Sequence, residues 1–169
     1  LKQRGVNFHM LFVGDGPRRA EMEAVVQKEG VAGQVTFAGR ISDREKVANI
    51  YLRSSAMLFP SLYDTSSLVP REASACGCPT VFVRGSSTAQ GVGGENGYLI
   101  ENNAGALADA VAHIAADPAR ARQVGDNARR TLYRSWEDAV DDAYRRYVYL
   151  MDRHKRGAHT DGGGNGIVL

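Results

Sequence analysis

The amino-acid sequence predicts an α/β fold with an open parallel sheet flanked by helices. Short apolar runs alternate along the chain with segments whose apolar residues recur at helical spacing, the order typical of βαβ units. The runs are almost continuously apolar, as at 80–83, which is typical of parallel strands covered on both faces. The length of 169 residues suits one domain. We expect a folded domain over 1–156 and a flexible Gly-rich tail over 157–169.

Composition narrows the classes of function. A formal net charge of +2, with no basic stretch interleaved with aromatic residues, argues against nucleic-acid binding. No apolar run approaches the ~20 residues that cross a bilayer, and the basic cluster at 153–156 leaves at most a peripheral membrane contact. Cys76 and Cys78 predict reduced thiols in the cytoplasm. No metal is expected, because the four histidines show no ligand spacing: His9, His113, His154 and His159.

The first half of the chain predicts two strand–helix units. The first is a strand over 8–13 and a helix over 18–29, with Pro17 at the first helical position and Gly30 at the end. Apolar residues such as Met22 give this helix a buried side. The second unit is a strand over 34–38 and a helix to about Ser54, which Ser42 or Asp43 caps and whose inner side carries Val47, Ala48, Ile50 and Tyr51.

Gly14 and Gly16 form a glycine loop between the first strand and the first helix. The loop lacks the full glycine pattern of dinucleotide-binding folds. Two interpretations stand at this point, a tight structural turn and a cradle for a phosphate group.

The next βαβ unit carries the candidate site. A polar loop over 64–67 lies at the carboxyl end of a predicted strand, where ligands bind in open parallel sheets. Ser66 and Ser67 are candidate N-caps of the helix that follows, and Pro70 is tolerated in its first turn. The unit is expected to comprise strands over 56–59 and 80–83 and a helix over 68–76 that Gly77 ends.

The residues around this loop favour a sugar carried on a phosphate. A helix start offers unpaired N–H groups and a positive dipole end, which suit a phosphate. Asp64 and Glu72 flank this position, and carboxylates accept hydrogen bonds from sugar hydroxyls rather than bind phosphate.

The remainder of the chain continues the same fold. The Gly-, Ser- and Thr-rich segment 84–94 predicts a loop with at most one short helix, and Ser135 is expected to cap the last helix. Further elements are a strand within 95–100 and helices over 106–116, 118–133 and 136–153.

The motif Asp64-x7-Glu72, followed by Ala73-x-Ala75-Cys76-Gly77-x-Pro79, resembles the Glu-x7-Glu signature of the retaining family 4 glycosyltransferases. The stretch 95–100 is similar to a further segment of that family, and the resemblance covers about 8–150. It implies one half of a GT-B fold, the Rossmann-like carboxyl-terminal domain that binds a nucleotide-sugar donor.

The resemblance also implies roles for individual residues. Glu72 is expected to bind the ribose hydroxyls and Asp64 the hydroxyls of the donor sugar, as the catalytic pair. The backbone N–H groups of Ser66, Ser67 and Leu68 would hold the diphosphate. Arg40 and Ile41 would lie against the nucleobase, with a solvated loop cation as the alternative for Arg40, and Gly14 and Gly16 would line the donor cleft.

Two departures from the family pattern concern the sugar and the diphosphate. The family usually has Glu at the first acidic position, and Asp64 is one methylene shorter. An aromatic-Gly pair of the family is replaced by Ser66-Ser67, which keeps the backbone amides and adds hydroxyl groups.

The implied reaction is transfer of a hexose-type sugar from a nucleotide diphosphate sugar, such as a UDP-sugar, to a sugar or lipid acceptor in carbohydrate biosynthesis. Configuration is retained, and neither a cofactor nor a metal is required. The family's amino-terminal domain and two cations for the diphosphate are missing here, so the isolated chain is expected to be inactive. The alternatives are a non-catalytic nucleotide-sugar-binding module that partners a separate chain, and a GT-B-type sugar-nucleotide epimerase domain.

The resemblance further predicts a gap in the sheet. The family's strand order is 3-2-1-4-5-6, and the run over 8–13 corresponds to its second strand. Its first strand, which would lie between 8–13 and 56–59, is missing. We therefore expect a slot with two exposed strand edges and poor solubility of the chain.

Overall fold

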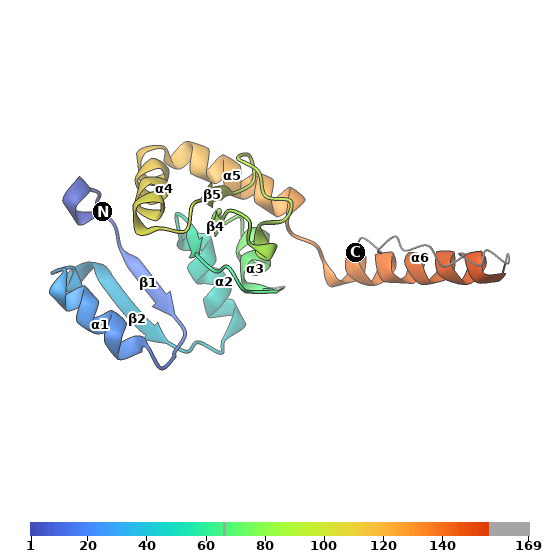
Figure 1. Cartoon of the computed structure of the whole chain (residues 1–169), viewed down its shortest axis with the longest axis horizontal. Coiled ribbons are helices and arrows are strands. Elements are labelled where there is room, and N and C mark those ends of the chain that lie inside the picture. The colour runs from blue at the N-terminus through green and yellow to red at the C-terminus, as the bar shows by residue number, and fades with distance from the viewer. Residues whose placement is uncertain (66, 156–169) are drawn as a thin grey trace. The chain divides into compact units, whose positions relative to one another are not determined.

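The computed structural model describes residues 1–65 and 67–155. The chain divides into two compact units, Leu1–Tyr133 and Arg134–Leu169. Figure 1 shows the helices and strands of each unit. The predicted tail over 157–169 lies outside the described residues.

The first part of unit 1 holds two strand–helix pairs, as predicted. The Asp43 side chain accepts hydrogen bonds from the amides of Glu45 and Lys46 at 3.0 and 3.2 Å, which makes it the N-cap of the second helix. Pro17 was expected at the first helical position but lies in the preceding turn, where the Arg19 amide donates to the Gly16 carbonyl. The elements are η1 (Lys2–Arg4), β1 (Met10–Val13), α1 (Arg19–Lys28), η2 (Ala32–Gln34), β2 (Val35–Gly39) and α2 (Arg44–Arg53).

The second part of unit 1 continues the alternation of strands and helices. The side chains of Asn103 and Asp117 accept hydrogen bonds from backbone amides at the starts of α4 and α5, respectively. The short helix expected within 84–94 is present as η3. The elements are β3 (Met57–Phe59), α3 (Val69–Ala75), β4 (Thr80–Val83), η3 (Ser87–Ala89), β5 (Tyr98–Ile100), α4 (Ala104–Ala116) and α5 (Pro118–Thr131).

The strands form two parallel sheets rather than one. β1 pairs with β2, where the Phe12 and Phe37 rings stack with centroids 5.0 Å apart. β3, β4 and β5 form the other sheet in that order. Among the described residues no strand joins β1 to β3, so each is an edge strand (Figure 1). The expected absence of pairing between these two strands is confirmed, and the poor solubility expected from it stays a prediction.

The core lies around β4. All four residues of β4 are buried, and one cluster of buried apolar side chains comprises Val81, Ile100, Ile114 and Ala121. Between Leu1 and Thr65, by contrast, no residue is buried. The apolar area removed from water, and the stability that follows from it, are therefore concentrated in the second half of unit 1.

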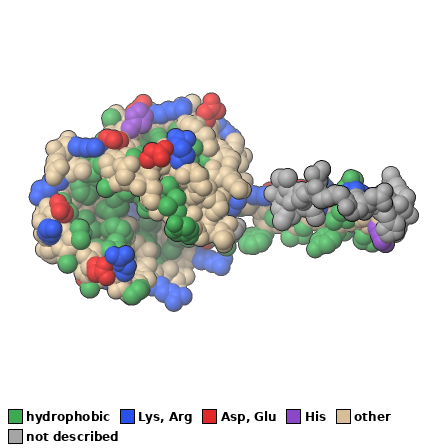
Figure 2. All heavy atoms as spheres, in the orientation of Figure 1, with side chains coloured by type: hydrophobic (Ala, Val, Ile, Leu, Met, Phe, Trp, Pro, Cys, Tyr) green, Lys and Arg blue, Asp and Glu red, His purple; other side chains and the backbone are tan. Residues whose placement is uncertain are grey.

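The expectation that the strand over 8–13 is covered on both faces is wrong. Leu11, Phe12 and Val13 are 37%, 36% and 43% exposed. α1 has no buried residue either, and Met22 and Val25 on it are exposed. The physical reason is that β1 belongs to a sheet of two strands, so few neighbouring side chains flank its faces. Figure 2 shows hydrophobic side chains, coloured green, at the surface of unit 1.

In unit 2, α6 (Trp136–Lys155) begins at the predicted cap. The Asp138 amide donates to the Ser135 hydroxyl at 3.0 Å, and Arg134 forms an ion pair with Asp142. Throughout residues 1–65 and 67–155, no helix combines the length and apolar character that a membrane crossing requires.

Candidate functional site

The loop that leads into α3 differs in one detail from its prediction. Leu68 is the N-cap residue of α3, and no side chain caps the helix. Ser67 was expected to cap it but is half-buried beside a pocket instead, and Ser66 lies outside the described residues. Pro70 occupies the first turn as predicted. The first amides of α3 thus lack a side-chain acceptor within the described residues, which leaves them available to an external one.

Glu72 lies on α3 beside Tyr51 of α2. Burial raises the pKa of Tyr51 to about 12, and the negative charge of Glu72 adds to this effect. Within the described part of the chain, the Glu72 carboxylate forms no hydrogen bond or ion pair, and Glu72 is exposed. An exposed carboxylate without a protein partner can accept hydrogen bonds from a ligand.

Asp64 is half-buried in the loop after β3. Its backbone carbonyl accepts a hydrogen bond from the Ser87 hydroxyl, which connects the loop after β3 to η3 after β4. The Asp64 carboxylate, like that of Glu72, has no hydrogen-bond partner among the described residues. Its backbone position is thereby held while its side chain stays available.

The loops after β1 and β2 are joined directly. The Gly14 amide donates to the Gly39 carbonyl at 2.8 Å. Gly14 has a φ of +128°, so a tight turn accounts for the glycine at this position. The Gly16 amide donates to the Asp15 carboxylate at 2.9 Å, and a Cβ added to Gly16 would meet nothing within 4 Å. The structure thus supports a turn here.

Arg40 and Ile41 follow Gly39, so the hydrogen bond from Gly14 brings all four predicted residues of these two loops together. Arg40 is exposed and Ile41 is half-buried. An exposed guanidinium fits both interpretations of Arg40, as a contact to a nucleobase and as a solvated cation.

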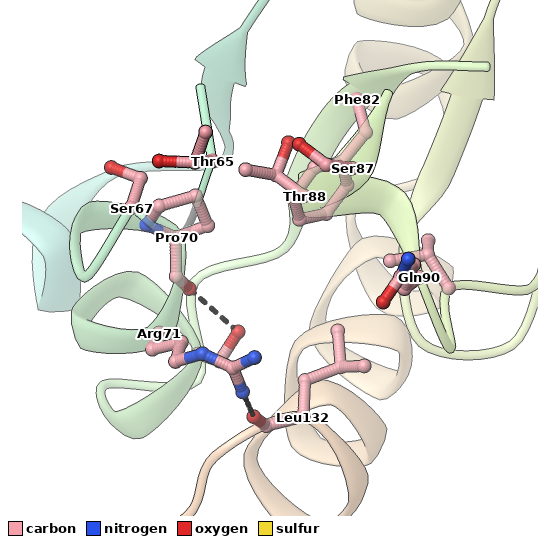
Figure 3. A pocket seen from close by; sticks show the side chains of 11 residues that line it. Thr65, Ser67, Pro70, Arg71, Phe82, Ser87, Thr88, Gln90 and Leu132 are labelled. Atoms are coloured by element: carbon pink, nitrogen blue, oxygen red, sulfur yellow. Dashed lines mark hydrogen bonds between the residues drawn. The ribbon is translucent and has the colours of Figure 1, made fainter. Parts of the chain in front are cut away.

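A pocket of about 130 Å³ opens between the loop after β3, the segment after β4 and the end of α5 (Figure 3). Its lining mixes hydroxyl and amide groups with an apolar base. The Arg71 guanidinium at its rim donates to the Leu132 carbonyl at 3.1 Å. The lining residues are Thr65, Ser67, Pro70, Arg71, Ser74, Phe82, Ser87, Thr88, Gln90, Val92 and Leu132.

Of the predicted site residues that the structure describes, Ser67 alone lines this pocket. Thr88 and Gln90 were not predicted, although the polar segment that holds them was recognised as a loop. The signal was the pairing of β3 with β4, because the loops at the carboxyl ends of neighbouring parallel strands meet at one edge of a sheet. The βαβ unit expected over 56–83 already implied this pairing, so the sequence could have indicated that the segment after 83 lies beside the Asp64 loop.

The cysteines next to α3 are both free. Cys78 is buried, and this burial raises the pKa of its thiol to about 12. Burial also raises the pKa of the Cys76 thiol. A thiolate is the reactive form of cysteine, so neither side chain is suited to act as a nucleophile. Nowhere in the described ranges do three or more His, Cys, Asp or Glu side chains form a group that could hold a metal ion.

Comparison with known proteins identifies the chain's relatives. The family model described as "Glycosyl transferases group 1" matches residues 1–131. The chain is 30% identical over 140 residues to a GDP-mannose-dependent alpha-(1-6)-phosphatidylinositol dimannoside mannosyltransferase from Mycobacterium tuberculosis. This match covers 83% of the chain and 35% of the relative, so the chain spans about a third of that protein.

Solved structures show the same fold. A sucrose-phosphate synthase from Thermosynechococcus elongatus matches with 34% identity and a TM-score of 0.72, over 84% of the chain and 38% of that protein. The carboxyl-terminal domain of a group 1 glycosyl transferase from Francisella tularensis matches with 18% identity and a TM-score of 0.62, over 76% of the chain and 86% of that domain. An Anabaena protein in complex with UDP-glucose matches with 22% identity and a TM-score of 0.64, over 72% of the chain and 35% of that protein.

Proposed function

Because this chain belongs to the group 1 glycosyl transferases, the family 4 enzymes, and has the fold of a GT-B carboxyl-terminal domain, we propose that residues 1–156 bind the nucleotide-sugar donor of a retaining glycosyltransferase. The donor is a nucleoside diphosphate carrying a hexose-type sugar. A related protein is described as GDP-mannose-dependent, and a structurally similar one was solved with UDP-glucose.

The observation that carries the proposal is the free carboxylate of Glu72. It occupies the second acidic position of the family motif, and within the described residues it has no hydrogen-bond partner. Because no protein group uses this exposed carboxylate, its full capacity to accept hydrogen bonds is available to a ligand. In this proposal Glu72 accepts hydrogen bonds from the two ribose hydroxyls.

The other predicted residues follow from this placement. The backbone amides of Ser66, Ser67 and Leu68 hold the diphosphate at the start of α3. Because α3 has only seven residues, these hydrogen bonds contribute more than the dipole of so short a helix. Asp64 faces the hydroxyls of the donor sugar. Arg40 and Ile41, which the Gly14–Gly39 hydrogen bond holds beside the glycine loop, lie against the nucleobase.

The complete reaction needs a second domain. The chain spans about a third of its curated relative, and the acceptor, a sugar or a lipid, is proposed to bind a partner GT-B domain. We propose that the chain alone binds the donor without transferring the sugar, and that it acts in the cytoplasm, where Cys76 and Cys78 stay reduced.

The substitution Glu72→Ala tests the proposal. Hydrogen bonds to a charged group are worth about 1.5–3 kcal/mol, so the variant is expected to bind UDP or GDP about tenfold more weakly or worse. The measurement is isothermal titration of the 169-residue chain with each nucleotide. Glu72→Gln, which keeps the shape but not the charge, is expected to give an intermediate loss.

Glu29→Ala is the matched control. Glu29 is an exposed glutamate that follows α1, and its carboxylate has no hydrogen bond within the described residues. Its removal is expected to leave nucleotide affinity unchanged. Equal affinity of the wild type and Glu72→Ala would remove Glu72 from the site, and a chain that binds neither nucleotide would refute the proposed function.

A further inference from the structure

The pocket between the loop after β3 and the segment after β4 has side chains that the fold does not use. Within the described residues, the side chains of Thr65, Ser67 and Gln90 form no hydrogen bond, whereas the Ser74 hydroxyl donates to the Pro70 carbonyl at 2.8 Å. The hydroxyl groups of Thr88 and Ser86 form one hydrogen bond with each other at 3.2 Å. A hydroxyl group can donate one hydrogen bond and accept two, so that of Thr88 can form more. Unused hydroxyl and amide groups that converge on one pocket are typical of a binding site.

The chemistry of the lining points to a neutral ligand rich in hydroxyl groups. Hydroxyl and amide side chains both donate and accept hydrogen bonds, as sugar hydroxyls do. No acidic side chain lines the pocket among the described residues. The guanidinium of Arg71 is partly committed to the Leu132 carbonyl. The half-buried side chains of Val92 and Leu132 supply an apolar part of the lining for the carbon skeleton of a ring.

The pocket is connected to the loop that carries Asp64. The Ser87 hydroxyl donates to the Asp64 carbonyl, so η3 and the Asp64 loop hold each other in place. Ser67 belongs to both the predicted diphosphate loop and the pocket lining. A sugar joined to a diphosphate at Ser67 therefore has this pocket as its neighbour.

From this arrangement we propose that the pocket is the subsite that discriminates between donor sugars, with Thr88 and Gln90 as its specificity-determining residues and Ser87 as a positioning residue. The inference rests on the proposed function, since it assigns the sugar half of the same donor. It adds residues after β4 to a site otherwise built from the α3 loop. Figure 3 shows Thr88 and Gln90 on the segment that faces Ser67 and Pro70 across the pocket.

The test compares nucleotide sugars with the bare nucleotides. The 169-residue chain is titrated with UDP, GDP, UDP-glucose, UDP-N-acetylglucosamine and GDP-mannose, and the ratio of sugar-nucleotide affinity to nucleotide affinity is taken for each pair. In Thr88→Val and Gln90→Leu this ratio is expected to fall about two- to tenfold for the preferred sugar, the loss of one neutral hydrogen bond. Two variants are used so that misfolding of one, monitored by circular dichroism, does not decide the result.

Thr36→Val serves as the control, because Thr36 is an exposed threonine on β2 outside the pocket lining. Its ratio is expected to equal that of the wild type. An unchanged ratio in both pocket variants, or a wild type that binds bare and sugar-bearing nucleotides equally, overturns the subsite while the proposed function stands. Failure to bind any nucleotide refutes both. Tighter binding of UDP-glucuronic acid than of UDP-glucose, abolished by Arg71→Gln, would assign the pocket to a carboxylate and overturn the neutral-sugar proposal.

Discussion

At the scale of single residues, burial decides the acid–base behaviour of the side chains around α3. Cys78 is 1% exposed, and burial raises the pKa of its thiol from 9.0 to about 12. Burial, together with the charge of Glu72, raises the pKa of Tyr51 to about 12 from 10.0. Both groups are therefore neutral in the folded chain over a pH range in which they ionise in the unfolded chain.

This difference predicts a loss of stability at alkaline pH. Below about pH 9 the Cys78 thiol is protonated in both states, so its contribution to the free energy of unfolding is fully present. Between about pH 9 and 12 the unfolded chain releases a proton that the folded chain keeps, so the free energy of unfolding falls as pH rises. Urea unfolding at a series of pH values, with a reductant present, measures the slope.

Cys78→Ala removes the titrating group. We expect this variant to be less stable at pH 7, because it loses buried volume, but to lose less stability than the wild type between pH 9 and 12. Parallel curves for the two proteins would show that Cys78 ionises equally in both states and would contradict the prediction.

At the scale of elements, α5 packs closely on the turn that ends α3. Gly125 of α5 is buried, and a Cβ added to it would lie 2.0 Å from the Gly77 carbonyl oxygen and 2.9 Å from its carbonyl carbon. Gly77 itself has a φ of +70°, which favours glycine after a helix. Two glycines thus allow α5 to approach the backbone behind the candidate site.

Gly125→Ala is expected to destabilise the chain, although alanine is the better helix former. The gain in helix propensity is about 0.5–1 kcal/mol. The cost of overpacking is about 1–3 kcal/mol or more, and it dominates because the obstacle is backbone rather than a flexible side chain. The measurement is the midpoint of urea unfolding. Gly33→Ala is the control, since a Cβ there meets nothing within 4 Å, and a Gly125→Ala variant as stable as this control would contradict the packing.

At the scale of unit 1, buried residues are unevenly distributed. The part up to Thr65 has none, whereas β4 is buried throughout. The sheet of β1 and β2 is not hydrogen-bonded to that of β3, β4 and β5 among the described residues. Local opening requires less free energy where few apolar contacts are lost, so the first sheet is expected to open independently of the second.

Native-state hydrogen exchange tests this expectation. The amides of Met10–Val13 and Val35–Gly39 are predicted to exchange through an opening of lower free energy than those of Thr80–Val83, which should require global unfolding. Exchange followed by NMR at increasing low concentrations of denaturant separates the two cases. Equal protection of both sheets would mean that unit 1 opens as one cooperative body.

Much of the fold could be predicted from the sequence because its signals are local. The alternation of strands and helices, a cap at Ser42 or Asp43, the cap at Ser135, the stop at Gly77 and the motif from Asp64 to Glu72 depend on residues a few positions apart. The structure places the first of these caps at Asp43. Capping chemistry and apolar periodicity act over one or two helical turns, so the order of elements follows from them.

The tertiary structure alone decided which surfaces are covered and which loops meet. The exposure of Phe12, the joining of Asp64 to Ser87, the pocket that includes Thr88 and the approach of Gly125 to Gly77 all involve partners distant in sequence. An apolar run reads alike whether it has one neighbouring strand or two, because its pattern records the preference for burial and not the presence of a partner. Strand pairing brings together the loops that form the pocket, and burial by residues from other elements raises the pKa of Cys78.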